Sequence, residues 1–78
     1  MTVEILSPDK NIWKGEAVLV QLPGVDGLFE ILNKHAPLIS VLRKGTIKII
    51  TPDKSTQYIQ IKEGIVEVLN NNVIILTE

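Results

Sequence analysis

Turn-forming residues recur along this chain at roughly eight- to twelve-residue intervals, and the segments between them alternate apolar and polar side chains. The clearest alternation covers residues 58–62. A period of two is typical of half-buried β-strands, and no segment has a convincing helical period. Short strands at this spacing predict an all-β antiparallel sandwich or barrel.

Several segments have the composition of strands: residues 3–5, 11–14, 16–22, 28–32, 47–49, 58–62, 65–69 and 73–77. The segment 16–22 is largely apolar on both faces, which predicts a central strand covered on both sides. Arg43-Lys44-Gly45 and Glu63-Gly64 are interpreted as hairpin loops, with Gly45 in a left-handed conformation.

Residues 35–42 allow two interpretations. His35, Leu38, Ile39 and Leu42 follow a helical spacing, and Pro37 could occupy the first turn of a short helix. We favour a strand because the segment is short, contains β-branched residues and is followed by a glycine turn.

Apolar residues also fall on the face opposite the expected core. Ile50, Ile65 and Leu69 alternate with residues that we assign to the core. Contiguous exposed apolar surface on a soluble domain usually marks a partner, so we expect an interaction surface here. Trp13 is interpreted as a residue at the edge of the core rather than as a partner anchor.

The length of 78 residues allows one domain, which we expect to span residues 1–78. A net charge of −1 and only one Trp, one Tyr and one Phe argue against binding to nucleic acid or to anionic lipid. The absence of cysteine excludes disulfides and fits a reducing compartment. No apolar run approaches the ~20 residues that span a bilayer, and residues 1–10 lack a signal-peptide pattern, so we expect a soluble chain.

Catalytic and metal-binding patterns are missing. His35 is the only histidine, and no serine has a nucleophile-elbow motif, so His35 is interpreted as structural or interfacial. The Gly24 to Gly27 turn is too short for a phosphate loop. Asp26 and Glu30 lack further ligands at metal-binding spacing. We therefore expect no enzyme activity, no cofactor and no metal site.

The segment from Leu22 to Leu38 has the most distinctive spacing, Leu-Pro-Gly-x-x-Gly-x-Phe-x-Ile-Leu-x-x-His-Ala-Pro-Leu. This pattern resembles the hallmark of the epsilon subunit of the rotary F-type proton-translocating ATP synthase, called delta in mitochondria. Residues 7–15, 44–49, 64–68 and 72–76 are also similar to segments of this family. The resemblance thus covers essentially the whole chain.

The resemblance implies a ten-stranded antiparallel β-sandwich of two five-stranded sheets in the central stalk. It implies a rotor subunit that performs no chemistry, helps attach the gamma subunit to the membrane ring of c subunits, and couples proton translocation to ATP synthesis and hydrolysis. Such a chain would meet the membrane only through the complex, at the cytoplasmic face of the bacterial inner membrane.

The resemblance also implies a gamma-facing side that includes Ser7, His35 and Ser40, to which we add the apolar neighbour Ile39. The stretch 25–33 corresponds to the loop that meets the c ring.

Many relatives carry an acid at position 28, where this chain has leucine. If the loop is extended, Asp26, Leu28 and Glu30 share one face, and we expect the two acids to replace the missing one against basic loops of the ring. Many relatives also have Gly in place of Glu30 and Pro-Gly in place of Asn33-Lys34.

Many members of the family continue into a C-terminal pair of helices that can inhibit hydrolysis or bind ATP. The sequence given stops at Glu78, at the end of the last expected strand. We therefore expect no helical hairpin and none of its regulation, unless the sequence is part of a longer chain.

Two other classes remain as alternatives. A lipoyl- or biotinyl-type carrier domain would modify a lysine in a tight turn, and Lys44 is the candidate, although the Met-Lys motif of such turns is missing. An oligonucleotide-binding β-barrel is disfavoured by the charge and the few aromatic residues.

Overall fold

The computed structural model describes residues 1–78 and contains nine strands and no α-helix. The strands are β1 (Thr2–Leu6), β2 (Asn11–Glu16), β3 (Leu19–Gly24), β4 (Gly27–Leu32), β5 (Leu38–Leu42), β6 (Gly45–Ile50), β7 (Thr56–Ile61), β8 (Gly64–Leu69) and β9 (Asn72–Thr77). The all-β prediction is therefore confirmed. The structure has no helix long and apolar enough to cross a membrane.

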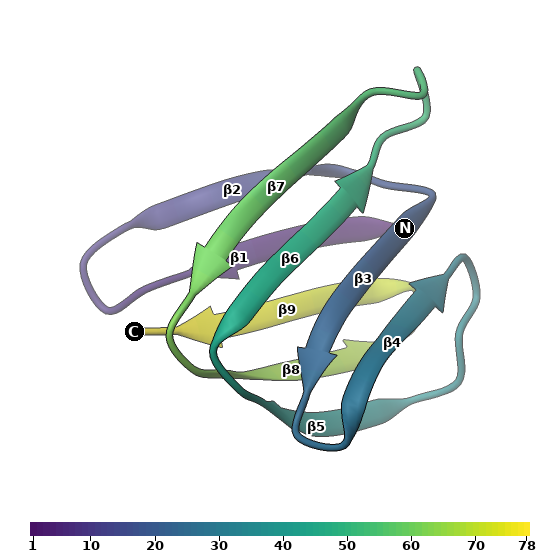
Figure 1. Ribbon diagram of the computed structural model, residues 1–78. Helices are drawn as coiled ribbons and strands as arrows, with labels where there is room; N and C mark the ends of the chain where they lie inside the picture. The colour runs from purple at the N-terminus through teal and green to yellow at the C-terminus, as the bar shows by residue number, and fades with distance from the viewer.

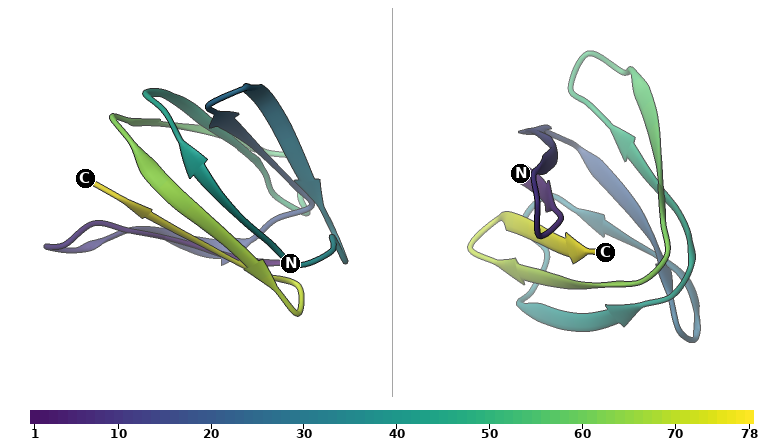
Figure 2. Two further views of the ribbon diagram at one scale, coloured as in Figure 1. Left: turned by 90° about the horizontal axis from the view of Figure 1, so that it is seen from below. Right: turned by 90° about the vertical axis from the view of Figure 1, so that its left-hand side faces the viewer.

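The strands lie in two layers around one core (Figure 1). The first layer has the order β2-β1-β9-β8-β5, and the second has the order β7-β6-β3-β4. Gly24 of β3 pairs with Leu42 of β5, so backbone pairing continues from one layer to the other. Figure 2 shows the resulting sheet curled around the core.

The sheet differs from the expected ten strands in two five-stranded sheets, because the second layer has four strands. The connection between β4 and β5, residues 33–37, adds no strand. There Lys34 has a φ of 63° and Pro37 lacks a backbone N–H, so neither can extend a regular ladder.

One pairing is parallel, whereas we expected antiparallel pairing throughout. Val3 of β1 lies opposite Val73 of β9, with the two strands running in the same direction. These are the first and last strands of the nine, so no tight turn joins them and none fixes their relative direction.

Four tight connections form hairpins, and four connections cross between the layers. The hairpins are β1–β2, β3–β4, β6–β7 and β8–β9. The β8–β9 turn has Asn70 and Asn71 at φ values of 50° and 62°, which is the mirror-image turn that asparagine tolerates well.

Gly45 and Gly64 do not form the hairpins that we expected, because each lies where the chain passes from one layer to the other. Gly27 is the only glycine with a positive φ. A Cβ on Gly45 would lie 2.7 Å from Pro23 Cβ, and a Cβ on Gly64 would lie 2.6 Å from the Leu76 carbonyl oxygen. Glycine is required at both positions because a neighbouring segment packs closely against the backbone there, and not because the turn needs a positive φ.

The core is a single cluster of 15 buried apolar residues that both layers contribute. Val20 and Leu22 of β3 are fully buried, whereas Leu19 and Gln21 on its outer side are half-buried. The central position predicted for this strand is confirmed, but its outer face is not fully covered. Trp13 is half-buried against the core, as expected, and its ring lies over Gly15.

Candidate interaction surfaces

Exposed apolar side chains gather on the outer face of the first layer. Val41, Ile65, Leu76 and Leu6 lie directly opposite one another in sequence across β5, β8, β9 and β1. Directly opposed Cβ atoms in a sheet are about 4.5–5.5 Å apart, so these four form one continuous apolar row. Val41, Ile65 and Leu76 are each about half exposed.

A second row runs beside the first and mixes apolar with acidic side chains. Ile39, Glu67, Ile74 and Glu4 are paired in that order across the same four strands. Ile39 is 72% exposed, the highest value among the large apolar residues of the chain. We call the two rows together the docking face.

An open hollow of about 530 Å³ lies along the apolar row. All four residues of that row line it, and Ser7 and Glu63 lie in its wall. The sequence prediction that Ile65 and Leu69 are exposed opposite a buried Val66 and Val68 is confirmed. Ile50, which we expected on the same surface, is half-buried on β6 of the other layer.

The residues expected on the gamma-facing side are not on one surface. Ser7 and Ile39 belong to the docking face or to the hollow beside it. Ser40 alternates with Ile39 and lies opposite the fully buried Val66, so its half-buried side chain is on the inner side of the layer. The expected grouping of Ser40 with Ile39 is therefore wrong, because neighbours along a strand point to opposite faces.

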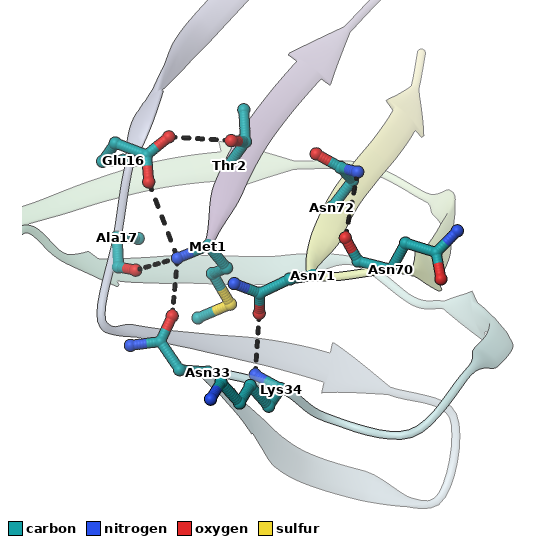
Figure 3. Close-up of polar contacts among 9 residues, drawn as sticks. All are labelled: Met1, Thr2, Glu16, Ala17, Asn33, Lys34, Asn70, Asn71 and Asn72. Atoms are coloured by element: carbon teal, nitrogen blue, oxygen red, sulfur yellow. Dashed lines mark hydrogen bonds and ion pairs between the residues drawn. The ribbon is translucent and has the colours of Figure 1, made fainter.

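His35 is exposed in the connection between β4 and β5. Its Nδ1 lies 2.7 Å from the Ala36 carbonyl oxygen, and because that oxygen only accepts, Nδ1 is the donor. Side-chain contacts hold the residues just before it (Figure 3). The Lys34 N–H donates to Asn71 Oδ1 at 2.7 Å, and the Met1 amino group donates to Asn33 Oδ1 at 2.6 Å. This connection is thus attached to the end of the first layer at which β1 and β9 begin.

The β3–β4 hairpin carries the residues expected to meet the ring. Leu28 and Glu30 share the outer face of β4, as predicted, and Leu28 is 67% exposed. Asp26 does not belong to that face, because Val25 and Asp26 are the two turn residues between the paired Gly24 and Gly27. Period-two reasoning fails here because the extended backbone of β4 begins only at Gly27, after the two turn residues. Glu30 accepts a hydrogen bond of 3.1 Å from Gln21 Nε2.

Basic residues lie beside this hairpin, and sequence reasoning missed them. A second open hollow, on the outer face of the second layer, is lined by Leu28 together with Arg43, Lys44 and Lys48. The Arg43 N–H donates to the Pro23 carbonyl oxygen at 2.9 Å, which holds the β5–β6 connection against β3. Lys44 therefore lies in a connection between layers and not at a hairpin tip, which argues against the carrier-domain alternative.

The carboxyl group of Asp53 has a perturbed pKa. In the β6–β7 turn the Thr51 hydroxyl and the Ser55 N–H both donate to Asp53, and these hydrogen bonds hold the pKa of that carboxyl below its usual value. The structure contains no cluster of three or more His, Asp or Glu side chains that could hold a metal ion.

Residues 1–78 match the family model described as the beta-sandwich domain of the ATP synthase delta/epsilon chain. The chain belongs to this family. Such a chain is a non-catalytic component of the synthase, which agrees with the prediction that this protein is not an enzyme.

Curated relatives are ATP synthase epsilon chains of bacteria. The one from Chlorobium limicola is 42% identical over 76 residues, which cover 97% of this chain and 86% of the relative. The one from Sulfurimonas denitrificans is 44% identical over 78 residues, which cover all of this chain and 60% of the relative. That from Bordetella avium is 41% identical, and the match covers 54% of it. The chain thus spans most of some relatives and little more than half of others.

Two solved structures have the same fold. A chain of the Euglena gracilis mitochondrial ATP synthase assembly of OSCP, F1 and c-ring superposes with a TM-score of 0.90 at 19% identity, covering 96% of this chain and 48% of that one. A chain of the Tetrahymena thermophila central stalk and c-ring gives a TM-score of 0.81 at 20% identity, covering 97% and 61%. At this identity the likeness establishes the fold.

Proposed function

We propose that this chain is a rotor subunit of the F-type ATP synthase central stalk. In this role it helps attach gamma to the c ring, so that proton translocation is coupled to ATP synthesis and hydrolysis. The observation that carries the proposal is the family match over the whole chain. Both structural neighbours come from assemblies whose descriptions include the c-ring.

The docking face is the proposed site for gamma. It combines a continuous apolar row with an adjoining hollow, and interfaces that carry load need a desolvated apolar centre with a polar rim. Ile39 and Ser7 contribute to it directly. His35 lies in the next connection, and Ser40 supports the β5 edge from the inner side.

The β3–β4 hairpin is the proposed site for the c ring. Asp26 stands at its tip, and Leu28 and Glu30 follow on one side of β4. The neighbouring Arg43 and Lys44 give this end of the molecule both signs of charge. We infer a contact in which Asp26 and Glu30 meet polar loops of the ring and the exposed Leu28 packs beside them.

The complex would place the chain at the membrane surface through its partners. The curated relatives are bacterial, which supports the cytoplasmic face of the bacterial inner membrane as its location.

Co-purification tests the proposal. Tagged chain should recover gamma and the c subunit from detergent-solubilised membranes of its host, together with the catalytic subunits. Recovery of the tagged chain without any subunit of the synthase would contradict it. Intact mass gives an independent check, because a lipoyl or biotinyl adduct on Lys44 would support the carrier alternative instead.

A further inference from the structure

The acids of the docking face have no cationic partner within the chain. The only ion pair of the molecule joins the Met1 amino group to Glu16, at 3.7 Å. Glu67 lies between Ile39 and Ile74, and Glu4 lies between Ile74 and Lys14 without reaching Lys14 closely enough to pair with it. Glu67 therefore has only apolar side chains directly opposite it, and Glu4 has one lysine opposite it with which it forms no ion pair.

Charge is distributed unevenly over the two outer faces, although Lys14 lies opposite Glu4 on the first and Glu30 lies on the second. Glu4 and Glu67 lie within the docking face and Glu63 lies at its hollow, with Lys14 at the far end of the row. The outer face of the second layer instead gathers Arg43, Lys44 and Lys48 around one hollow. A partner that covered the docking face without supplying cations would desolvate unpaired carboxylates, which is costly.

We infer that the segment of gamma on the docking face is amphipathic and basic. Its apolar side chains enter the hollow along the apolar row, and its Lys or Arg side chains meet Glu67 and Glu4. This inference rests on the proposed function and adds the chemistry of the partner surface. Cations placed in this way would neutralise the acids and accelerate the encounter by electrostatic steering.

The test measures the association rate of purified gamma with the intact chain across a series of salt concentrations. The double variant Glu4→Gln with Glu67→Gln removes both charges and keeps the side-chain shape. We expect association to slow on the order of threefold to tenfold at low salt and its salt dependence to flatten, with dissociation changed less. A control, Asp53→Asn, removes a charge from the second layer outside both proposed sites and should leave both quantities unaltered.

Two outcomes separate the inference from the proposed function. Suppose that Ile39→Lys abolishes binding while the glutamine variant associates at the wild-type rate and with the wild-type salt dependence. Gamma then binds the docking face, but the inference that its bound segment is basic is wrong. If Ile39→Lys also binds normally, the docking face itself is wrong. A second copy of this chain is the other possible partner, and sedimentation of the chain alone tests for it. If the chain forms concentration-dependent dimers that the glutamine variant does not form, the two acids bind the basic face of a second copy and not gamma.

Discussion

The outer faces of the two layers differ although both are built from strands of similar length. In the first layer, apolar side chains face each other across four neighbouring strands without interruption. In the second, the corresponding row is Glu30, Gln21, Lys48 and Tyr58, with a hydrogen bond between its first two members. The second layer also has an apolar row, Leu32, Leu19 and Ile50, but it crosses only three strands, and Leu19 and Ile50 are half-buried.

This difference indicates that the outer face of the second layer is the one better suited to contact with solvent. Polar rows can satisfy their hydrogen bonds with solvent and with each other, whereas a continuous apolar row gains free energy only when something covers it. A few exposed apolar residues are ordinary on any domain. The greater exposure of the first layer's row and the hollow along it therefore favour the first layer as the docking face.

The largest expected effect comes from matched lysine substitutions on the two faces. Ile39 on β5 is 72% exposed and Tyr58 on β7 is 66% exposed, so lysine should leave the fold intact at either position. Ile39→Lys should weaken gamma binding by about 2 kcal/mol or more, because it brings a charge into a desolvated apolar contact. Tyr58→Lys should have no effect. Calorimetric titration with gamma measures the affinity of each variant. Equal affinities would contradict the proposal that gamma binds the first layer and not the second.

Next in size is the stability difference between the two glycines at the crossings. Gly64→Ala would press a methyl group against the Leu76 carbonyl oxygen of the first layer, and Gly45→Ala would press one against the Pro23 ring of the second. Overpacking costs about 1–3 kcal/mol, with the larger loss expected at Gly64 because backbone yields less than a side chain. Urea unfolding measures the change in the free energy of unfolding. A larger loss for Gly45→Ala would mean that the first layer is the more deformable one.

Local patterns in the sequence predicted the strands and the true hairpins well. The alternation of Ile65 to Leu69 identified its buried and exposed sides, and Asn70-Asn71 identified a turn. The strand at residues 38–42 was also predicted correctly over the helical alternative. In each case the decisive interaction lies within a few residues along the chain, where period and turn chemistry act.

Features that depend on distant segments were not predicted from the residues. Gly45 and Gly64 have the composition of hairpin turns, yet their neighbours are Pro23 and Leu76, far away in sequence. The parallel pairing of β1 with β9 and the hollow that joins Leu28 to Arg43 arise in the same way. The side of Ser40 could have been predicted, because alternation with Ile39 already excludes a shared face.

A smaller effect is expected at the proposed ring contact. Single reversal of Asp26 or Glu30 should be tolerated, since exposed charge pairs contribute only about 0.2–1 kcal/mol each. Asp26→Lys together with Glu30→Lys would add two cations beside Arg43 and Lys44 and should weaken attachment to basic ring loops, most clearly at low salt. ATP-driven proton pumping in reconstituted membranes measures this, with gamma binding of the same variant as the control. Unchanged pumping and ring association at low salt would exclude the two acids from the contact.

The smallest effect concerns Asp53, an exposed acid of the second layer that lies outside both proposed sites. Hydrogen bonds from the Thr51 hydroxyl and the Ser55 N–H lower its pKa in the folded state below the unfolded value. Their stabilising contribution is therefore fully present above the unfolded pKa and is lost as the pH falls through the folded pKa. Thr51→Val removes the hydroxyl donor, so the carboxyl titration of Asp53 followed by NMR should move to higher pH. Gamma binding should stay unchanged, because the turn belongs to the solvated face. An unchanged titration would mean that the hydroxyl does not hold the carboxylate, and altered gamma binding would extend the contact beyond the first layer.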